Sequence, residues 1–131
     1  MAANPGTHTF PTLSAKFPYG FGGLPQELRT DEFLRAYLAQ PLTIYLGSED
    51  TERDEHLDIL PAAEAQGKFR DRKKCHFERG KNAFAAAKSL AAERKWPFGW
   101  KLAVVNGIGH DHEKMFNHEE CATALGWKPA K

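Results

Sequence analysis

Two short apolar runs, each followed by glycine and polar residues, constrain the fold of this chain most. Residues 42–46 are β-branched and aromatic and lie between Pro41 and Gly47, as is typical of a buried strand. Residues 100–105 form a second such run, and an Asn-Gly turn follows it. Because a helical pattern separates the two runs, the sequence predicts an α/β fold with a mostly parallel sheet flanked by helices.

Three segments carry helical patterns. Thr30 begins the first as an N-cap with acidic residues in the first turn, and Pro41 ends it. Residues 76–95 place apolar side chains on one helical face and Arg, Lys and Glu on the other. A last helix is predicted over residues 111–125, with Gly126 as its C-cap.

The remaining segments leave the sheet small. Residues 1–30 are rich in proline and glycine and are expected to form an ordered loop. Residues 48–74 are polar and charged, with a turn at Gln66-Gly67. A strand stub at Ala2-Ala3 would raise the sheet to three strands, against about five or six in a typical sheet. The chain is therefore expected either to meet a partner or to be part of something larger.

Charge and hydropathy exclude several functions. Eighteen Lys and Arg against 17 Asp and Glu leave a net charge of +1, so the electrostatic argument for a nucleic-acid or membrane-surface binder is missing. The basic run at 70–74 is interpreted as solvated surface. No apolar run approaches the roughly 20 residues of a membrane span, and no signal-peptide pattern opens the chain. A small or uncharged ligand fits better, and the compartment is not predicted.

The two cysteines point to no metal or redox motif. Cys75 and Cys121 are far apart in sequence, and neither stands in a C-x-x-C context. A disulfide between them and two free thiols are both open alternatives, because pairing depends on a spacing that sequence does not reveal. No cofactor is expected.

Polar side chains follow both strands. Asp50 comes shortly after the first strand and His110 shortly after the second. Ligands of open α/β sheets bind beyond the carboxyl ends of the strands, so the two side chains are expected to converge. An aspartate that holds histidine Nδ1–H leaves Nε2 free as a general base, as in a Ser-His-Asp triad. The plainer interpretation is a turn with an Asx hydrogen bond and a histidine that caps a helix.

Two other acids compete for the same role. Glu49 precedes Asp50 directly, and Asp54 lies about one turn beyond it. Asp50 is preferred because the spacing Gly-x-x-Asp places it just past the strand.

The third member of a triad is missing from the sequence. A nucleophile elbow, Gly-x-Ser-x-Gly on a sharp strand-to-helix turn, does not occur. Ser14 stands in a proline-rich loop, Ser48 next to the predicted acid, and Ser89 within a helix. The chain alone is therefore not expected to complete a triad.

Several local patterns, in this order, resemble one family. The chain is similar to the C-terminal half of the α/β-hydrolases, especially the polyhydroxybutyrate depolymerases and related serine esterases. The segments that carry the resemblance are Ala2-Ala3-Asn4-Pro5-Gly6, Phe17-Pro18-Tyr19-Gly20, residues 42–51, Ala65-Gln66-Gly67, Arg79-Gly80 and residues 100–111.

The resemblance implies that residues 1–131 form a single partial domain, the C-terminal portion of a three-layer sandwich. It assigns Asp50 as the triad acid and His110, in Gly-x-Gly-His, as the base. The family's serine and oxyanion loop would precede Met1, so the nucleophile-bearing N-terminal half is expected to be absent. The implied function is the C-terminal part of a carboxylic-ester hydrolase, inactive alone, whose full-length form takes a small uncharged ester. The uncovered sheet edge would favour self-association.

Two alternatives come from other classes. The first is a non-catalytic half-domain that serves as an interaction module. The second is a metal site built from His110, Asp111, His112 and His118. His110 and His112 are two residues apart and do not share a helix face, and no H-E-x-x-H pattern exists, so the hydrolase interpretation is preferred.

Overall fold

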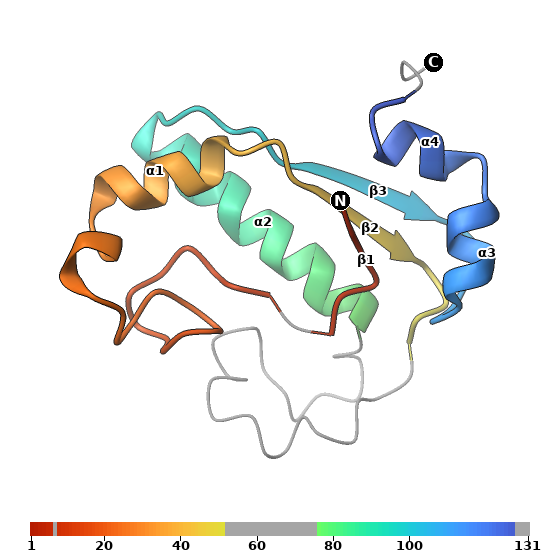
Figure 1. Cartoon of the computed structure of the whole chain (residues 1–131), viewed down its shortest axis with the longest axis horizontal. Coiled ribbons are helices and arrows are strands. Elements are labelled where there is room, and N and C mark those ends of the chain that lie inside the picture. Colours follow the sequence, from red (N-terminus) through yellow and green to blue (C-terminus); the bar gives the residue numbers. More distant parts are fainter. Residues whose placement is uncertain (7, 52–75, 128–131) are drawn as a thin grey trace.

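The structure, a computed structural model, describes residues 1–6, 8–51 and 76–127. Within these residues the chain forms a small sheet with helices on both faces (Figure 1). The predicted turn at Gln66-Gly67, the competing acid Asp54, Cys75 and the basic run at 70–74 lie outside the described residues.

The sheet has three parallel strands in the order β1-β2-β3. They are β1 (Ala2–Ala3), β2 (Thr43–Gly47) and β3 (Lys101–Val105). In the register of the sheet, Tyr45 of the central strand lies between Ala3 and Ala103. The predicted α/β class, the parallel sheet and the strand at Ala2-Ala3 are confirmed. Because all three strands run the same way, their carboxyl ends meet at one edge.

Side chains of β2 alternate between two cores, so the molecule has three layers. Ile44 and Leu46 pack on one face in a core that includes Leu38, Ala87 and Trp100. Tyr45 points to the other face, in a core formed with Val105, Met115, Cys121 and Ala124. A strand buried on both faces is expected to be continuously apolar, as the buried residues 44–46 are.

Two helices cover the first face. They are α1 (Asp31–Ala39) and α2 (His76–Arg94). Thr30 is the N-cap of α1, and its hydroxyl accepts a hydrogen bond from Phe33 N–H. Small residues let α2 approach the sheet closely, since a Cβ at Gly80 would lie 2.7 Å from the Leu46 side chain. The prediction that Arg79 lies on the polar, solvated face of α2 is wrong, because this residue is fully buried.

The opposite face carries two short helices instead of the single predicted one. They are α3 (His112–Asn117) and α4 (Glu120–Ala124). The helix stops because His118 adopts an extended conformation, and its Nδ1 accepts a hydrogen bond from Glu120 N–H. The side chain thus satisfies a donor that a continuous helix would have bonded through its backbone. Gly126 follows α4 with a φ of 78°, which agrees with its predicted capping role.

Residues 8–30 form the predicted ordered loop, with one turn of 3-10 helix at Gln26–Leu28. Phe21 anchors it through edge-to-face contacts with Phe33 and Tyr37 of α1.

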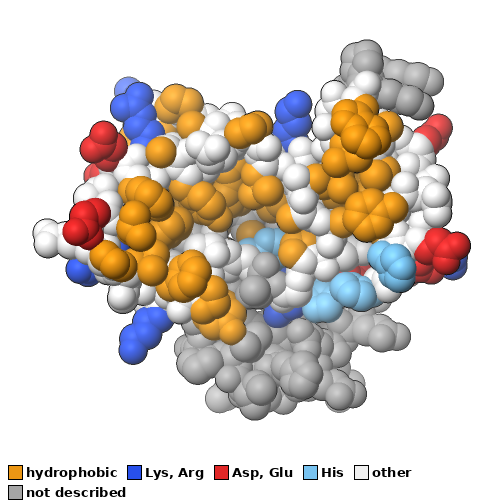
Figure 2. Space-filling view, viewed as in Figure 1, with side chains coloured by type: hydrophobic (Ala, Val, Ile, Leu, Met, Phe, Trp, Pro, Cys, Tyr) orange, Lys and Arg blue, Asp and Glu red, His pale blue; other side chains and the backbone are white. Residues whose placement is uncertain are grey.

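Apolar side chains are spread over the face viewed in Figure 2, and histidines reach the surface of that face. No helix among the described residues is long and apolar enough to cross a membrane.

Candidate active site

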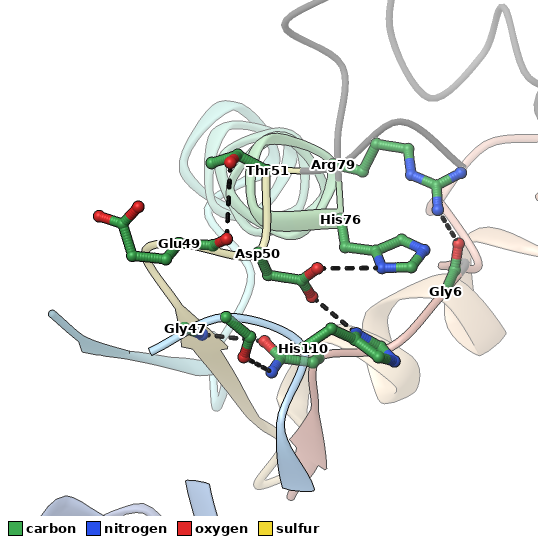
Figure 3. A network of polar contacts seen from close by, with 10 residues as sticks. Gly6, Gly47, Glu49, Asp50, Thr51, His76, Arg79 and His110 are labelled. Atoms are coloured by element: carbon green, nitrogen blue, oxygen red, sulfur yellow. Dashed lines mark hydrogen bonds and ion pairs between the residues drawn. The ribbon is translucent and has the colours of Figure 1, made fainter. Parts of the chain in front are cut away.

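Asp50 and His110 lie in hydrogen-bond contact at the carboxyl ends of neighbouring strands. Asp50 follows β2 and His110 follows β3, and Oδ2 of the aspartate is 2.9 Å from Nδ1 of the histidine (Figure 3). The two residues are 60 positions apart in sequence. The sequence predicted this convergence from the topology of a parallel sheet, whereas the catalytic role of the pair stays a prediction.

The two side chains differ strongly in their exposure. The Asp50 side chain is 2% exposed and the His110 side chain is 61% exposed. Glu49 is exposed, and its carboxylate points away from His110 in Figure 3. Of the two adjacent acids, Asp50 therefore holds the imidazole, while the far side of the ring is open to a reactant.

Backbone contacts bring the two loops together. Glu49 N–H donates across the loops to the Ile108 carbonyl at 2.9 Å. Within the first loop, Asp50 N–H donates to the Gly47 carbonyl at 3.1 Å. Gly47 permits this approach, since a Cβ there would lie 2.2 Å from the Ile108 carbonyl oxygen. No side chain fits at that position without moving the loop that leads to His110.

Asn4 joins the end of β1 to both loops. Its Oδ1 accepts from Gly47 N–H at 2.8 Å, and its Nδ2 donates to the Gly109 carbonyl at 3.2 Å. The residue has a φ of 41°, in the left-handed region that asparagine tolerates better than most side chains. Asn4 was not among the site residues predicted from sequence, because an isolated asparagine after a two-residue strand carries no recognisable signal.

His76 is a second histidine at the buried carboxylate. Its Nδ1 lies 3.4 Å from Oδ1 of Asp50, and its ring centroid is 4.9 Å from that of His110. Phe77 N–H donates to the Asp50 carbonyl at 3.1 Å, which fixes the start of α2 beside the acid. The sequence analysis missed His76, because the neighbouring segment 48–74 offers no pattern that would place it near Asp50.

A buried cation lies behind this group. The Arg79 guanidinium donates a hydrogen bond to the Gly6 carbonyl (Figure 3). Burial, with the charges of Arg79 and His76, lowers the pKa of His8 to about 4. His8 is therefore neutral at pH 7 and adds no further positive charge.

The metal site considered from sequence is not assembled. Asp111 caps α3 by accepting from Lys114 N–H, and this hydrogen bond lowers the pKa of the Asp111 carboxyl. His118 is engaged with Glu120. Among the residues that the structure describes, the one group of three with suitably placed ligand atoms consists of Asp50, His76 and His110.

A small pocket adjoins the exposed side of this site. It has a volume of about 130 Å³ and lies between the end of β1 and α3, with Asn4, His110, Met115 and Phe116 in its lining. Ser48 Oγ is engaged with Gly107 N–H and Ser14 Oγ with Thr12. Within the described part of the chain, no serine forms a hydrogen bond with His110.

Two solved structures resemble the chain over almost its whole length. A poly(3-hydroxybutyrate) depolymerase, LpqC from Bordetella parapertussis, is 36% identical over 98% of this chain and 40% of its own, with a TM-score of 0.75. The fold of the chain, a parallel sheet flanked by helices, is of the α/β-hydrolase type. Poly(aspartic acid) hydrolase-1 from Sphingomonas sp. KT-1 is 35% identical over 96% of this chain and 44% of its own, with a TM-score of 0.74.

This α/β-hydrolase-type chain thus spans less than half the length of both solved structures. No family model and no curated protein matches the chain. The predicted fold and family resemblance are confirmed, and the similarity supports a hydrolase type of function.

Proposed function

We propose that the chain is the acid-and-base part of a serine-type carboxylic-ester hydrolase. The observation that carries this proposal is the 2.9 Å contact between Asp50 and His110 at the carboxyl edge of a parallel sheet. In this role Asp50 orients the imidazole and stabilises the imidazolium that forms during reaction, and Nε2 of His110 transfers the proton. The nucleophilic serine and the oxyanion donors would come from a segment outside this sequence.

Two further observations support the role. The carboxylate is almost fully buried and the histidine is mostly exposed, which suits an acid that orients and a base that meets substrate. The pocket of about 130 Å³ borders His110 and provides space for part of a small substrate. We propose an uncharged ester as that substrate, since the net charge of +1 offers little attraction for a polyanion.

A fusion protein tests the proposal directly. The chain would replace the matching 40% of the Bordetella depolymerase, and the product would be assayed with p-nitrophenyl butyrate. We expect ester hydrolysis by the fusion and at most a residual rate by the isolated chain, because a triad that lacks its nucleophilic serine retains only residual catalysis. Robust turnover by the isolated chain that His110→Ala abolishes would refute its proposed inactivity.

The reading frame upstream of the Met1 codon offers an independent test. An in-frame Gly-x-Ser-x-Gly there would support the missing nucleophile, whereas a stop codon directly upstream would contradict it.

A non-catalytic interaction module is the second candidate. In the described residues β1 pairs with β2 alone, so its other edge is open to another strand. Phe17 and Trp127 are also 58% and 76% exposed. Sedimentation equilibrium would test self-association: a monomer at all concentrations would contradict pairing between copies of this chain.

A further inference from the structure

One carboxylate and two imidazoles from separate elements converge at the carboxyl edge of the sheet. Asp50 comes from the turn after β2, His76 from the first residue of α2 and His110 from the loop after β3. One atom of each, a carboxylate oxygen or an imidazole nitrogen, lies within 4.8 Å of the other two. Figure 3 shows both imidazoles turned toward the carboxylate.

We propose that Asp50, His76 and His110 form a Zn²⁺ site. Two imidazole nitrogens and one carboxylate oxygen are ligands that zinc accepts readily, and three protein ligands leave a fourth position for water. Mg²⁺ and Ca²⁺ prefer oxygen ligands alone, so the two histidines select against them. The donor chemistry therefore points to a borderline-soft divalent ion.

The observed distances are close to those a zinc ion requires. Zinc lies about 2.0–2.2 Å from nitrogen and oxygen ligands, which places tetrahedral ligand atoms roughly 3.4 Å apart. Asp50 Oδ2 is 2.9 Å from His110 Nδ1, and Asp50 Oδ1 is 3.4 Å from His76 Nδ1, so the two imidazoles contact different oxygens of the carboxylate. The widest separation in the group, up to 4.8 Å, must shorten. His110 is the ligand that adjusts, because its exposed ring is the least constrained by packing.

Burial explains how an ion would enter and stay. The Asp50 and His76 side chains are 2% and 17% exposed, so they form the inner wall of the site. His110 closes the site from the solvent side. An ion would enter past this ring and meet a carboxylate that already lies between two nitrogen donors.

Zinc and the hydrolase dyad exclude one another. A zinc ion on His110 Nδ1 takes the place of the proton that this nitrogen shares with Asp50. The imidazole then no longer has the orientation and hydrogen bond that general-base catalysis needs. Zinc would therefore inhibit the hydrolase, a consequence that rests on the proposed function, whereas zinc binding itself does not.

Zinc titration of the 131-residue chain tests the binding. We expect calorimetry to give one Zn²⁺ per chain, Co²⁺ to give visible d–d absorption, and Mg²⁺ to give no saturable heat. His76→Asn should weaken zinc binding at least tenfold. His112→Asn removes an exposed histidine outside the group and should leave the affinity unchanged. No saturable zinc binding, or an equal loss in both variants, would overturn the proposal.

Nuclear magnetic resonance of the unsubstituted chain keeps the test valid if a variant fails to fold. Zinc should shift the imidazole ¹⁵N signals of His76 and His110 and leave those of His112 unchanged. A shift confined to His112 or His118 would overturn the site.

The hydrolase fusion tests the regulatory part separately. Zinc should inhibit its ester hydrolysis, with each rate normalised to the zinc-free rate of the same variant. His76→Asn should raise the inhibition constant at least tenfold over that of the unsubstituted fusion. Zinc binding without inhibition of an active fusion would overturn regulation. An inactive but folded fusion that binds zinc would instead contradict the proposed function.

Discussion

The side-chain amide of Asn4 donates a hydrogen bond to the carbonyl of Gly109, which lies 105 positions later in the sequence. The same side chain accepts from Gly47 N–H through its oxygen. One amide thus links the loop before Asp50 to the loop before His110. Its donor and its acceptor are both used, so no other side chain of similar size replaces it fully.

Substitution of Asn4 should loosen both loops. Asn4→Gly accepts the φ of 41° without strain but loses both side-chain hydrogen bonds, and should lower the free energy of unfolding by about 1–3 kcal/mol. Asn4→Asp keeps the acceptor for Gly47 and sets a carboxylate oxygen against the Gly109 carbonyl. Urea denaturation would measure both effects, and an unchanged midpoint in both variants would contradict the linking role.

The carboxylate of Asp50 should dominate catalysis in the hydrolase fusion. Asp50→Asn keeps the shape but favours the wrong histidine tautomer, and should lower kcat by about 10⁴-fold. Glu49→Gln is the matched control, because Glu49 is the exposed adjacent acid. Steady-state kinetics would compare them, and equal losses in the two variants would move the acid away from Asp50.

Gly47→Ala should separate the two loops. The new Cβ would meet the Ile108 carbonyl at 2.2 Å, and a backbone atom has little room to move aside. We expect a loss of about 1–3 kcal/mol in the free energy of unfolding. The hydrogen bond to Asp50 should move the His110 Nδ1–H proton resonance downfield, and this resonance should disappear in the variant. Gly126→Ala is the control, since Gly126 has a φ of 78° but open space around it. Its variant should be strained and still show the resonance.

Tyr45→Phe should weaken the attachment of α3 to the sheet. The Tyr45 hydroxyl donates to the Met115 carbonyl at 2.8 Å, in the last turn of α3, where the helix leaves carbonyls without partners. The variant should be less stable by about 1–2 kcal/mol at pH 7. Hydrogen exchange should be faster in α3 and unchanged in α1. An equal change of the exchange rates in α1 and α3 would contradict this local effect.

Alkaline pH should destabilise the protein through the same residue. Burial raises the pKa of Tyr45 to about 12, above its ordinary value of 10.0. As pH rises, the unfolded chain loses this proton before the folded chain does. The stabilisation that the protonated Tyr45 hydroxyl contributes is therefore fully present below pH 10 and is lost as pH rises toward 12. The contribution of one such tyrosine is about 3 kcal/mol. The free energy of unfolding should fall less between pH 9 and pH 11.5 in Tyr45→Phe than in the unsubstituted chain. An equal fall in both proteins would contradict the assignment to Tyr45.

The sequence allowed the topology to be predicted because its signals are local. Strands that carry apolar side chains on both faces, and caps such as Thr30, depend on neighbouring residues alone. The convergence of Asp50 and His110 followed from one general property of parallel sheets. The break at His118 was missed, because helical periodicity continues through it. Glu120 N–H can be satisfied either by a backbone carbonyl in a continuous helix or by His118 Nδ1, and the sequence pattern does not distinguish the two.

The missed site residues are those placed by tertiary contacts. Asn4 and His76 reach the site from the end of β1 and the start of α2, and neither position has a characteristic spacing to Asp50. Arg79 was assigned to a solvated face by its charge, yet it is buried with its guanidinium bonded to Gly6. Each depends on the packing of distant segments, which residue type and periodicity do not encode.

The contacts between Asp50 and the first turn of α2 have a consequence for how this sequence can vary. The Asp50 carbonyl accepts from Phe77 N–H, so the two ends of the intervening segment are held together by described residues. Because the donor is a backbone N–H, every residue type except proline can supply this hydrogen bond at position 77. The start of α2 therefore keeps its place beside the acid through a contact that depends little on side-chain identity.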